Sequence, residues 1–149
     1  MKTNELTSKD LMVGDLVQIK EKDGKKLVGA FRVVAIGKTY LAGVISDFVE
    51  HGTVSISCIE DEKRVYQTEV CNIEPIPLTP EILEKNGLAN DPYGCHFEED
   101  EYMELEISAE EEGIYWTINY NEYAIMKLKY VHQLQHALRL CGINKEIVL

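Results

Sequence analysis

The chain lacks any long apolar segment. Within its 149 residues no window approaches the roughly 20 consecutive apolar residues that a membrane-spanning helix needs. The polar residues 1–10 do not resemble a secretory leader, because no apolar stretch follows their lysine. We therefore expect a soluble, cytoplasmic protein that has no membrane partner.

Paired cysteines are also missing. The four cysteines stand far apart and form no CxxC pair, which disfavours a zinc knuckle or a disulfide framework. We expect reduced, partly buried thiols at Cys58, Cys71, Cys95 and Cys141.

Basic residues are absent from residues 86–126, which hold eleven carboxylates. The rest of the chain has 15 acidic and 15 basic residues, so the net charge of −11 comes from this one segment. Such a segment repels phosphate backbones, and direct nucleic-acid binding through it is therefore disfavoured. The carboxylates are Asp91, Glu98, Glu99, Asp100, Glu101, Glu104, Glu106, Glu110, Glu111, Glu112 and Glu122.

The common catalytic and cofactor motifs are missing as well. Neither GxSxG nor GxGxxG occurs, and the tripeptide Gly37-Lys38-Thr39 is only the end of a phosphate-binding loop. Arg32 stands where that loop needs its first glycine, and both flanks have strand character. We interpret the tripeptide as a hairpin turn and expect no cofactor.

His132 and His136 are the weak candidates for metal ligands, because an i, i+4 spacing places both on one face of a helix. The general-base glutamate of HExxH is missing between them, and Arg139 on the same face would oppose a cation. We favour a polar or partly exposed helix face and no metal. Cys95-His96 adds ligands only if the fold brings it alongside. The run 98–101 lacks the spacing of a calcium loop and predicts a solvated acidic loop.

The first half reads as short strands separated by glycine or charged turns, with Asp23-Gly24 as a hairpin signal. The phrase at 11–17, hydrophobic-Gly-Asp-hydrophobic-Val in outline, resembles the opening of SH3-like barrels. Five strands in about 60 residues favour an SH3-like β-barrel over 8–72. The predicted strands are 15–20, 28–36, 39–46, 53–59 and 64–70.

Residues 73–88 are expected to form a proline-rich linker followed by a short helix. The prolines at 75 and 77 push their neighbours into extended backbone. Thr79 supplies an N-cap oxygen, Pro80 suits the first helical position, and Gly87 stops the helix so that Leu88 packs back on Leu83.

Residues 89–149 predict a three-stranded antiparallel meander covered by a C-terminal helix over 130–141. Strict alternation of apolar and acidic residues over 103–107 marks a half-buried strand. The helix has an apolar stripe and ends at Gly142, where Ile143 contacts Leu138. The fold class is therefore β-rich α+β, and whether the two halves share one core stays open. The stripe is Val131, Leu134, Ala137, Leu138 and Cys141.

The outer face of the meander is the candidate binding surface. The alternation places three large side chains, Tyr115, Tyr123 and Ile125, among the carboxylates Glu104 and Glu106. Tyrosine combines apolar area with a polar tip and is enriched at interfaces.

We therefore favour a non-enzymatic protein-binding or regulatory module with a protein partner. Three alternatives stay open. The carboxylates would imitate DNA phosphates and inhibit a nucleic-acid enzyme if they formed one stripe. A small hydrolase or metal-binding protein needs a pocket that collects His96, His132 or His136. A nucleic-acid-binding role would depend on Lys20, Lys22, Lys25 and Lys26.

Three segments, at 13–17, 73–88 and 130–149, resemble a family of small proteins from gut Bacteroidales and their phages or mobile elements. They cover about a quarter of the chain, and IEPIPLTPEILEKNGL and YVHQLQHALRLCGINKEIVL are the specific phrases. The resemblance implies unknown function, since no activity is assigned to that family, and it carries over no catalytic or binding residues.

Overall fold

The computed structural model describes residues 6–7, 9–20, 29–37, 52–88, 95–98, 104–110, 115–120 and 123–149. The fold is α+β and rich in strands. The chain divides into an N-terminal unit, Met1–Ile76, and a C-terminal unit, Pro77–Leu149. Each unit is described by itself.

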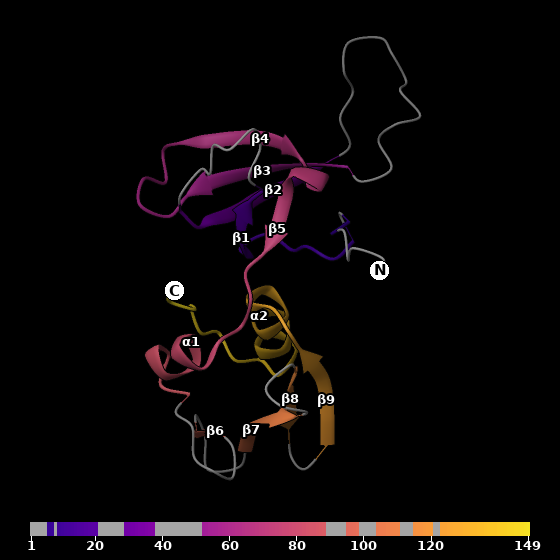
Figure 1. Cartoon of the computed structure of the whole chain (residues 1–149), viewed down its shortest axis with the longest axis vertical. Coiled ribbons are helices and arrows are strands. Elements are labelled where there is room, and N and C mark those ends of the chain that lie inside the picture. The colour runs from indigo at the N-terminus through magenta and orange to yellow at the C-terminus, as the bar shows by residue number, and fades with distance from the viewer. Residues whose placement is uncertain are drawn as a thin grey trace. The chain divides into compact units, whose positions relative to one another are not determined.

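The N-terminal unit is a five-stranded antiparallel sheet with the order β4-β3-β2-β1-β5 (Figure 1). A single turn of 3-10 helix, Val70–Asn72, leads from β4 to β5, which returns to pair with β1. No ladder joins β4 to β5 among the described residues, so the sheet is not closed. The strands are β1 (Leu16–Ile19), β2 (Phe31–Gly37), β3 (Thr53–Cys58), β4 (Val65–Glu69) and β5 (Ile73–Pro75).

One face of this sheet carries the core of the unit. Val33, Ile56 and Val54 are each at most 1% exposed, and they lie on adjacent strands in register. A bulge between Val33 and Ala35 shifts the β2 register so that Ile36 pairs with Val54. Leu6 and Leu11, from the segment before β1, complete the same apolar cluster.

A tight turn leads into β1. Gly14 has a φ of 94°, a conformation that side chains with a Cβ rarely adopt. Asp15 is fully buried, and its carboxylate accepts a 2.7 Å hydrogen bond from the Met12 N–H. The Gly14 N–H donates to the Val33 carbonyl over 2.7 Å, while the Val33 N–H donates to the Asp15 carbonyl over 2.9 Å. The Gly-Asp pair therefore anchors the start of the sheet to β2.

Four of the five strands predicted in the first half are confirmed, within a few residues at their ends. The fifth, at 39–46, lies outside the described residues, as does the Asp23-Gly24 turn. The proline-rich segment is extended as predicted, but Ile73–Pro75 forms strand β5 of the sheet. Pairing of Ile73 with Ile19 explains the difference, because it buries Ile73 in the core.

The C-terminal unit combines a four-stranded antiparallel sheet, ordered β6-β7-β8-β9, with two helices (Figure 1). The sequence predicts three strands here; the additional one is β6. The elements are α1 (Pro80–Lys85), β6 (Cys95–Glu98), β7 (Glu104–Glu110), β8 (Tyr115–Tyr120), β9 (Tyr123–Leu128) and α2 (Val131–Leu140).

Both helices end in the same way. Gly87 and Gly142 have φ angles of 74° and 75° and follow the caps of α1 and α2. Leu88 N–H donates to the Leu83 carbonyl and Ile143 N–H to the Leu138 carbonyl, each over 2.8 Å. These are Schellman closures, and they confirm the predicted helix ends.

The predicted start of α1 is confirmed as well. The Thr79 hydroxyl accepts a hydrogen bond from the Ile82 N–H, with Pro80 at the first helical position. A separate side-chain hydrogen bond between Thr79 and Glu81 lowers the pKa of the Glu81 carboxyl. In α2, every residue of the predicted apolar stripe is at most 8% exposed.

Asn86, the cap of α1, also holds the last residues of the chain. Its side-chain amide donates to the Val148 carbonyl over 2.7 Å and accepts from the Val148 N–H over 2.8 Å. The same amide donates to the Ile82 carbonyl over 2.7 Å, and the residue is 5% exposed. Lys85 donates to the carbonyl of Leu149. Residues 146–149 form no strand, and the Asn86 side chain holds them in place of a ladder.

Replacing Asn86 by alanine should lower the free energy of unfolding by about 1–3 kcal/mol, because the backbone N–H and carbonyl of Val148 lose their partner in two part-buried hydrogen bonds. Chemical denaturation measures this change. The matched control is Glu84→Ala at an exposed position of the same helix. Equal stability losses in the two variants would contradict this role of Asn86.

Candidate functional site

The backbone register of the second sheet gathers acidic positions on one face. Glu98 is directly opposite Glu104, and His96 is opposite Glu106. Because alternate residues of a strand point to the same face, Glu110 shares the face of Glu104 and Glu106. We call the positions Glu98, Glu104, Glu106 and Glu110 the acidic face. They are the four carboxylate positions that the structure describes between 86 and 126.

At the end of β9, the two faces of the sheet differ in exposure. Leu128 is 0% exposed and pairs with Trp116, whereas the exposed Lys127 pairs with Thr117. The alternation along β8 carries this distinction to Asn119, which pairs with Glu106. The acidic face is therefore the one that Lys127 shares. Leu128 is on the opposite face, and its strand, β9, contacts α2.

A bulge in β9 redistributes the predicted binding residues. Ile118 pairs with Met126, but Asn119 pairs with Ala124, so Ile125 has no partner in the register. Beyond the bulge, Tyr123 is opposite Tyr120, which alternation assigns to the face of Ile118.

The other predicted residues keep their common face. Tyr115 is opposite Glu110, on the same face as Glu104 and Glu106. The register thus places the predicted residues Tyr115, Glu104 and Glu106 on one face and Tyr123 on the other. Sequence reasoning did not place His96 and Glu98 on this face, which they join through β6. Their only sequence signal is the short Cys-His-Phe-Glu alternation before the acidic run.

Carboxylates at directly opposite positions repel one another, because residues paired across a sheet have Cβ atoms about 4.5–5.5 Å apart. Lys127 is a basic position on this face, opposite Thr117. Such an arrangement attracts cationic groups and disfavours phosphate.

The two histidines of α2 form a ring cluster. The His132 ring stacks on Tyr130 at 5.8 Å between centroids, and it meets His136 edge-on at 5.6 Å. A polar or partly exposed helix face is expected here; His132 is polar but only 3% exposed, while His136 is half-buried. Gln135 is buried too, so the buried part of α2 extends beyond the apolar stripe.

No other metal-ligating groups gather near this pair: within the described part of the chain, no three His, Cys, Asp or Glu residues form a cluster. Burial raises the pKa of the Cys141 thiol. Burial, together with a hydrogen bond to Glu69, also raises the pKa of Cys71. Both thiols therefore favour the protonated form, which is the opposite of an activated nucleophile.

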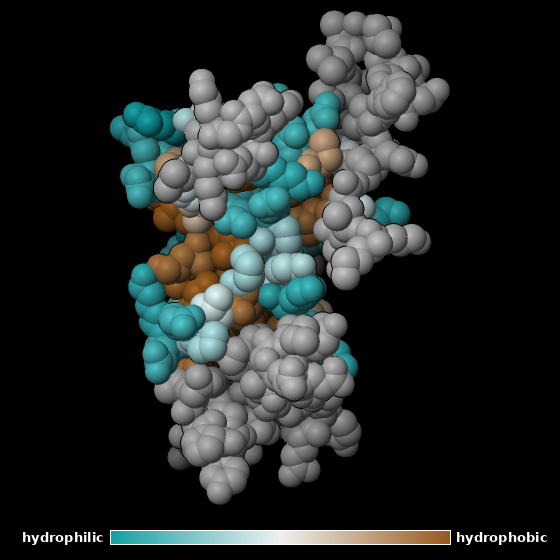
Figure 2. All heavy atoms as spheres, in the orientation of Figure 1, coloured by the Kyte–Doolittle hydropathy of each residue, from teal (hydrophilic) through white to brown (hydrophobic). Residues whose placement is uncertain are grey.

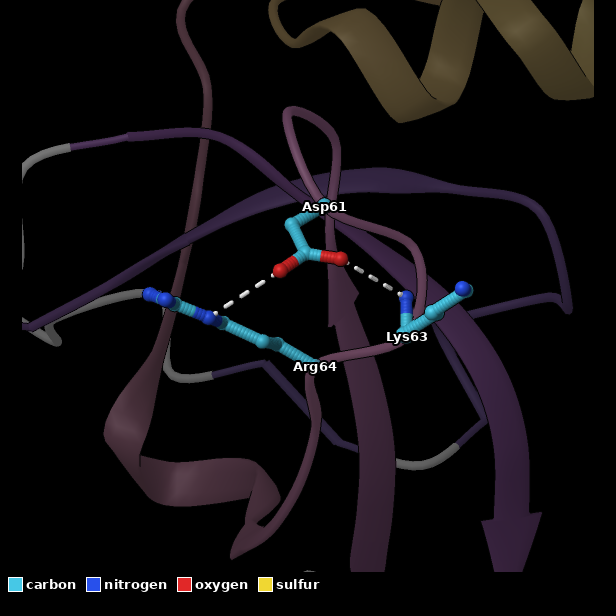
Figure 3. A network of polar contacts seen from close by, with 3 residues as sticks. All are labelled: Asp61, Lys63 and Arg64. Atoms are coloured by element: carbon cyan, nitrogen blue, oxygen red, sulfur yellow. Dashed lines mark hydrogen bonds and ion pairs between the residues drawn. The ribbon is translucent and has the colours of Figure 1, made fainter.

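The charged turn between β3 and β4 is held by Asp61. Its carboxylate accepts a hydrogen bond from the Lys63 N–H and pairs with the Arg64 guanidinium at 3.1 Å (Figure 3). This turn is part of the hydrophilic surface at the upper left of Figure 2. An exposed pair of this kind contributes little stability. Of the lysines considered for nucleic acid, Lys20 is described, whereas Lys22, Lys25 and Lys26 lie outside the described residues.

Comparison of the chain with protein-family models, curated proteins and solved structures finds no match. The resemblance to a Bacteroidales family therefore stays a prediction. In the part of the chain that the structure describes, no helix has the length and apolar character needed to cross a membrane. The evidence for function is therefore the chain's own geometry.

Replacing Glu104 by glutamine should raise the free energy of unfolding by about 0.2–1 kcal/mol, because it removes a like charge directly opposite Glu98. The gain should shrink at high salt, which screens the repulsion. Thermal unfolding at two salt concentrations measures both effects. Glu60→Gln, in the exposed β3–β4 turn, is the control and should change little. A loss of stability in Glu104→Gln would contradict the register argument.

Replacing His132 by alanine should cost roughly 0.5–3 kcal/mol of stability, because a buried ring leaves its stack with Tyr130. His136→Ala should cost less, since that side chain is half-buried. Denaturant unfolding of both variants tests the ranking. A reversed ranking would show that the ring cluster does not support α2.

Proposed function

We propose that the protein is a binding module that presents the acidic face to a basic surface of a protein partner. The observation that carries this proposal is the register of β6, β7 and β8, which collects Glu98, Glu104, Glu106 and Glu110 at neighbouring positions. Tyr115, Thr117 and Asn119 share the face by alternation. A surface that combines carboxylates with tyrosine and small polar groups suits lysine- and arginine-rich partners.

The size of the face sets the expected strength of binding. Four strands spaced about 4.8 Å apart, and a seven-residue strand at about 3.4 Å per residue, give a patch of about 14 Å by 24 Å. A stable interface buries about 800 Å² per partner, so this patch alone, at about 340 Å², is less than half that size. We therefore expect a salt-sensitive, transient complex in which charge sets the association rate.

Inhibition of a nucleic-acid enzyme by DNA mimicry is a special case of the same proposal. The acidic face would then occupy the enzyme's phosphate-binding groove. The two cases differ in one measurable way. If the acidic face occupies the partner's phosphate-binding groove, added nucleic acid competes with it for that groove. If the acidic face binds another basic surface of the partner, added nucleic acid does not displace it.

We also propose that the N-terminal unit is a variant of an SH3-like small barrel. A meander whose fifth strand returns to the first is consistent with such a barrel. The short helix Val70–Asn72 makes that return possible in three residues. Small barrels of this type are common scaffolds for binding, and function resides in the surface that each presents.

Neutralising the acidic face should abolish partner binding while leaving the fold intact. The test variant is Glu104→Gln, Glu106→Gln, Glu110→Gln. The matched control, Glu60→Gln, Glu62→Gln, Glu84→Gln, removes the same charge from exposed positions elsewhere. Tagged wild type and both variants are used to capture partners from lysate of the encoding organism at low and high salt, with mass spectrometry as the readout.

The proposal predicts a defined protein that wild type and the control retain at low salt, and that the test variant loses. Release of that protein by added duplex DNA would identify the mimic case. Equal retention by both variants, or capture that is insensitive to salt, would overturn the assignment of the acidic face.

A further inference from the structure

Strand β4 forms an edge of the first sheet among the described residues, and its hydrogen-bond pattern shows which backbone groups point outward. Cys58 N–H donates to the Arg64 carbonyl and Val70 N–H donates to the Gly52 carbonyl, each over 3.1 Å. In an antiparallel pair, inward-facing and outward-facing residues alternate. Arg64 and Val70 face β3, so the backbone groups of Val65, Gln67 and Glu69 face away from the sheet.

The side chains along this edge are exposed as well. Val65 is 56% exposed and Tyr66 is 43% exposed, although the Tyr66 ring still contacts Phe31 edge-on at 6.1 Å between centroids. Gln67 and Glu69 are exposed too. An edge with outward backbone groups and apolar side chains is a template for pairing with another strand.

We propose that a second copy of this chain pairs with the β4 edge, antiparallel and about a two-fold axis. One register uses all three outward-facing residues: Gln67 opposite its own copy, and Val65 opposite Glu69 of the other molecule. Each facing pair exchanges two N–H···O bonds. Tyr66 then lies opposite Thr68 of the other molecule, an aromatic and β-branched pair that favours association.

The charges along the strand select a second copy in this orientation. Lys63 and Arg64 precede β4, and Glu69 ends it. Antiparallel pairing brings Lys63 and Arg64 of one strand near Glu69 of the other, whereas parallel pairing places like charges together. Because a two-fold interface is self-complementary, one strand supplies both halves of this match. This inference is independent of the acidic face.

The first test separates the backbone from the side chain at Gln67. Proline is tolerated where an edge N–H makes no ladder bond, so Gln67→Pro should fold but lose its outward donor. Gln67→Ala removes the same side chain and keeps the N–H. Sedimentation velocity over a concentration series should show a monomer–dimer equilibrium for wild type and Gln67→Ala, and a monomer throughout for Gln67→Pro. Circular dichroism confirms that each variant is folded.

The second test fixes the register even if Gln67→Pro fails to fold. In the proposed dimer Gln67 faces itself with Cα atoms about 5.5 Å apart, within the range that a disulfide spans. Two Val65 residues would lie about 14 Å apart, which is too far. Gln67→Cys should therefore form a covalent dimer under mild oxidation much faster than Val65→Cys, with wild type as the baseline for the native thiols.

A wild-type monomer at every concentration overturns the proposal, as does equal cross-linking of Gln67→Cys and Val65→Cys. A dimer that survives Gln67→Pro unchanged would place the interface elsewhere and equally overturn it. Amide hydrogen exchange at Val65, Gln67 and Glu69 should slow as concentration rises if β4 is the interface.

Discussion

The acidic face depends on one constraint, the two-residue repeat that sends successive residues of a strand to opposite faces of the sheet. Where side chains can be followed at the end of β9, Leu128 is fully buried and Lys127 is exposed. This difference between neighbouring residues identifies the two faces of the whole sheet, because residues paired across adjacent strands lie on the same face. The carboxylate positions at every second residue of β7 therefore fall on the face that Lys127 shares.

The helices of the C-terminal unit support this arrangement. Segments far apart in the chain join: the Leu78 N–H donates to the Lys129 carbonyl over 3.0 Å, and Asn86 holds Val148. The Gln133 side chain accepts hydrogen bonds from the backbone N–H groups of Lys129 and Tyr130 at the start of α2. These bonds fix where β9 ends and α2 begins, and therefore which residues of β9 are buried.

Local signals in the sequence were enough to predict the helices and most strands. The caps at Thr79, Gly87 and Gly142 act within a few residues, so the sequence around each one specifies its geometry. The alternation around Glu104 and Glu106 likewise predicts their common face. By contrast, burial of His132 and the bond from Asn86 to Val148 arise from contacts between distant segments.

The binding surface could be predicted only in part for the same reason. Tyr115 keeps its expected place because no irregularity separates it from Glu110 in the register. Tyr123 does not, because the bulge at Ile125 adds one residue, and one residue reverses the faces of a strand. Strand β6 has only four residues, and it was not recognised from the sequence. Closure of a barrel depends on the distance between β4 and β5, which no local pattern encodes.

The central claim is that one face of the second sheet is acidic and solvent-exposed, and methyl NMR in the presence of a soluble gadolinium chelate tests it most directly. Thr117 and Ile118 are neighbours on β8 that the register assigns to opposite faces. The account predicts strong broadening of the Thr117 methyl signal and little broadening of the Ile118 methyl signals. Equal broadening, or the reverse order, would contradict it.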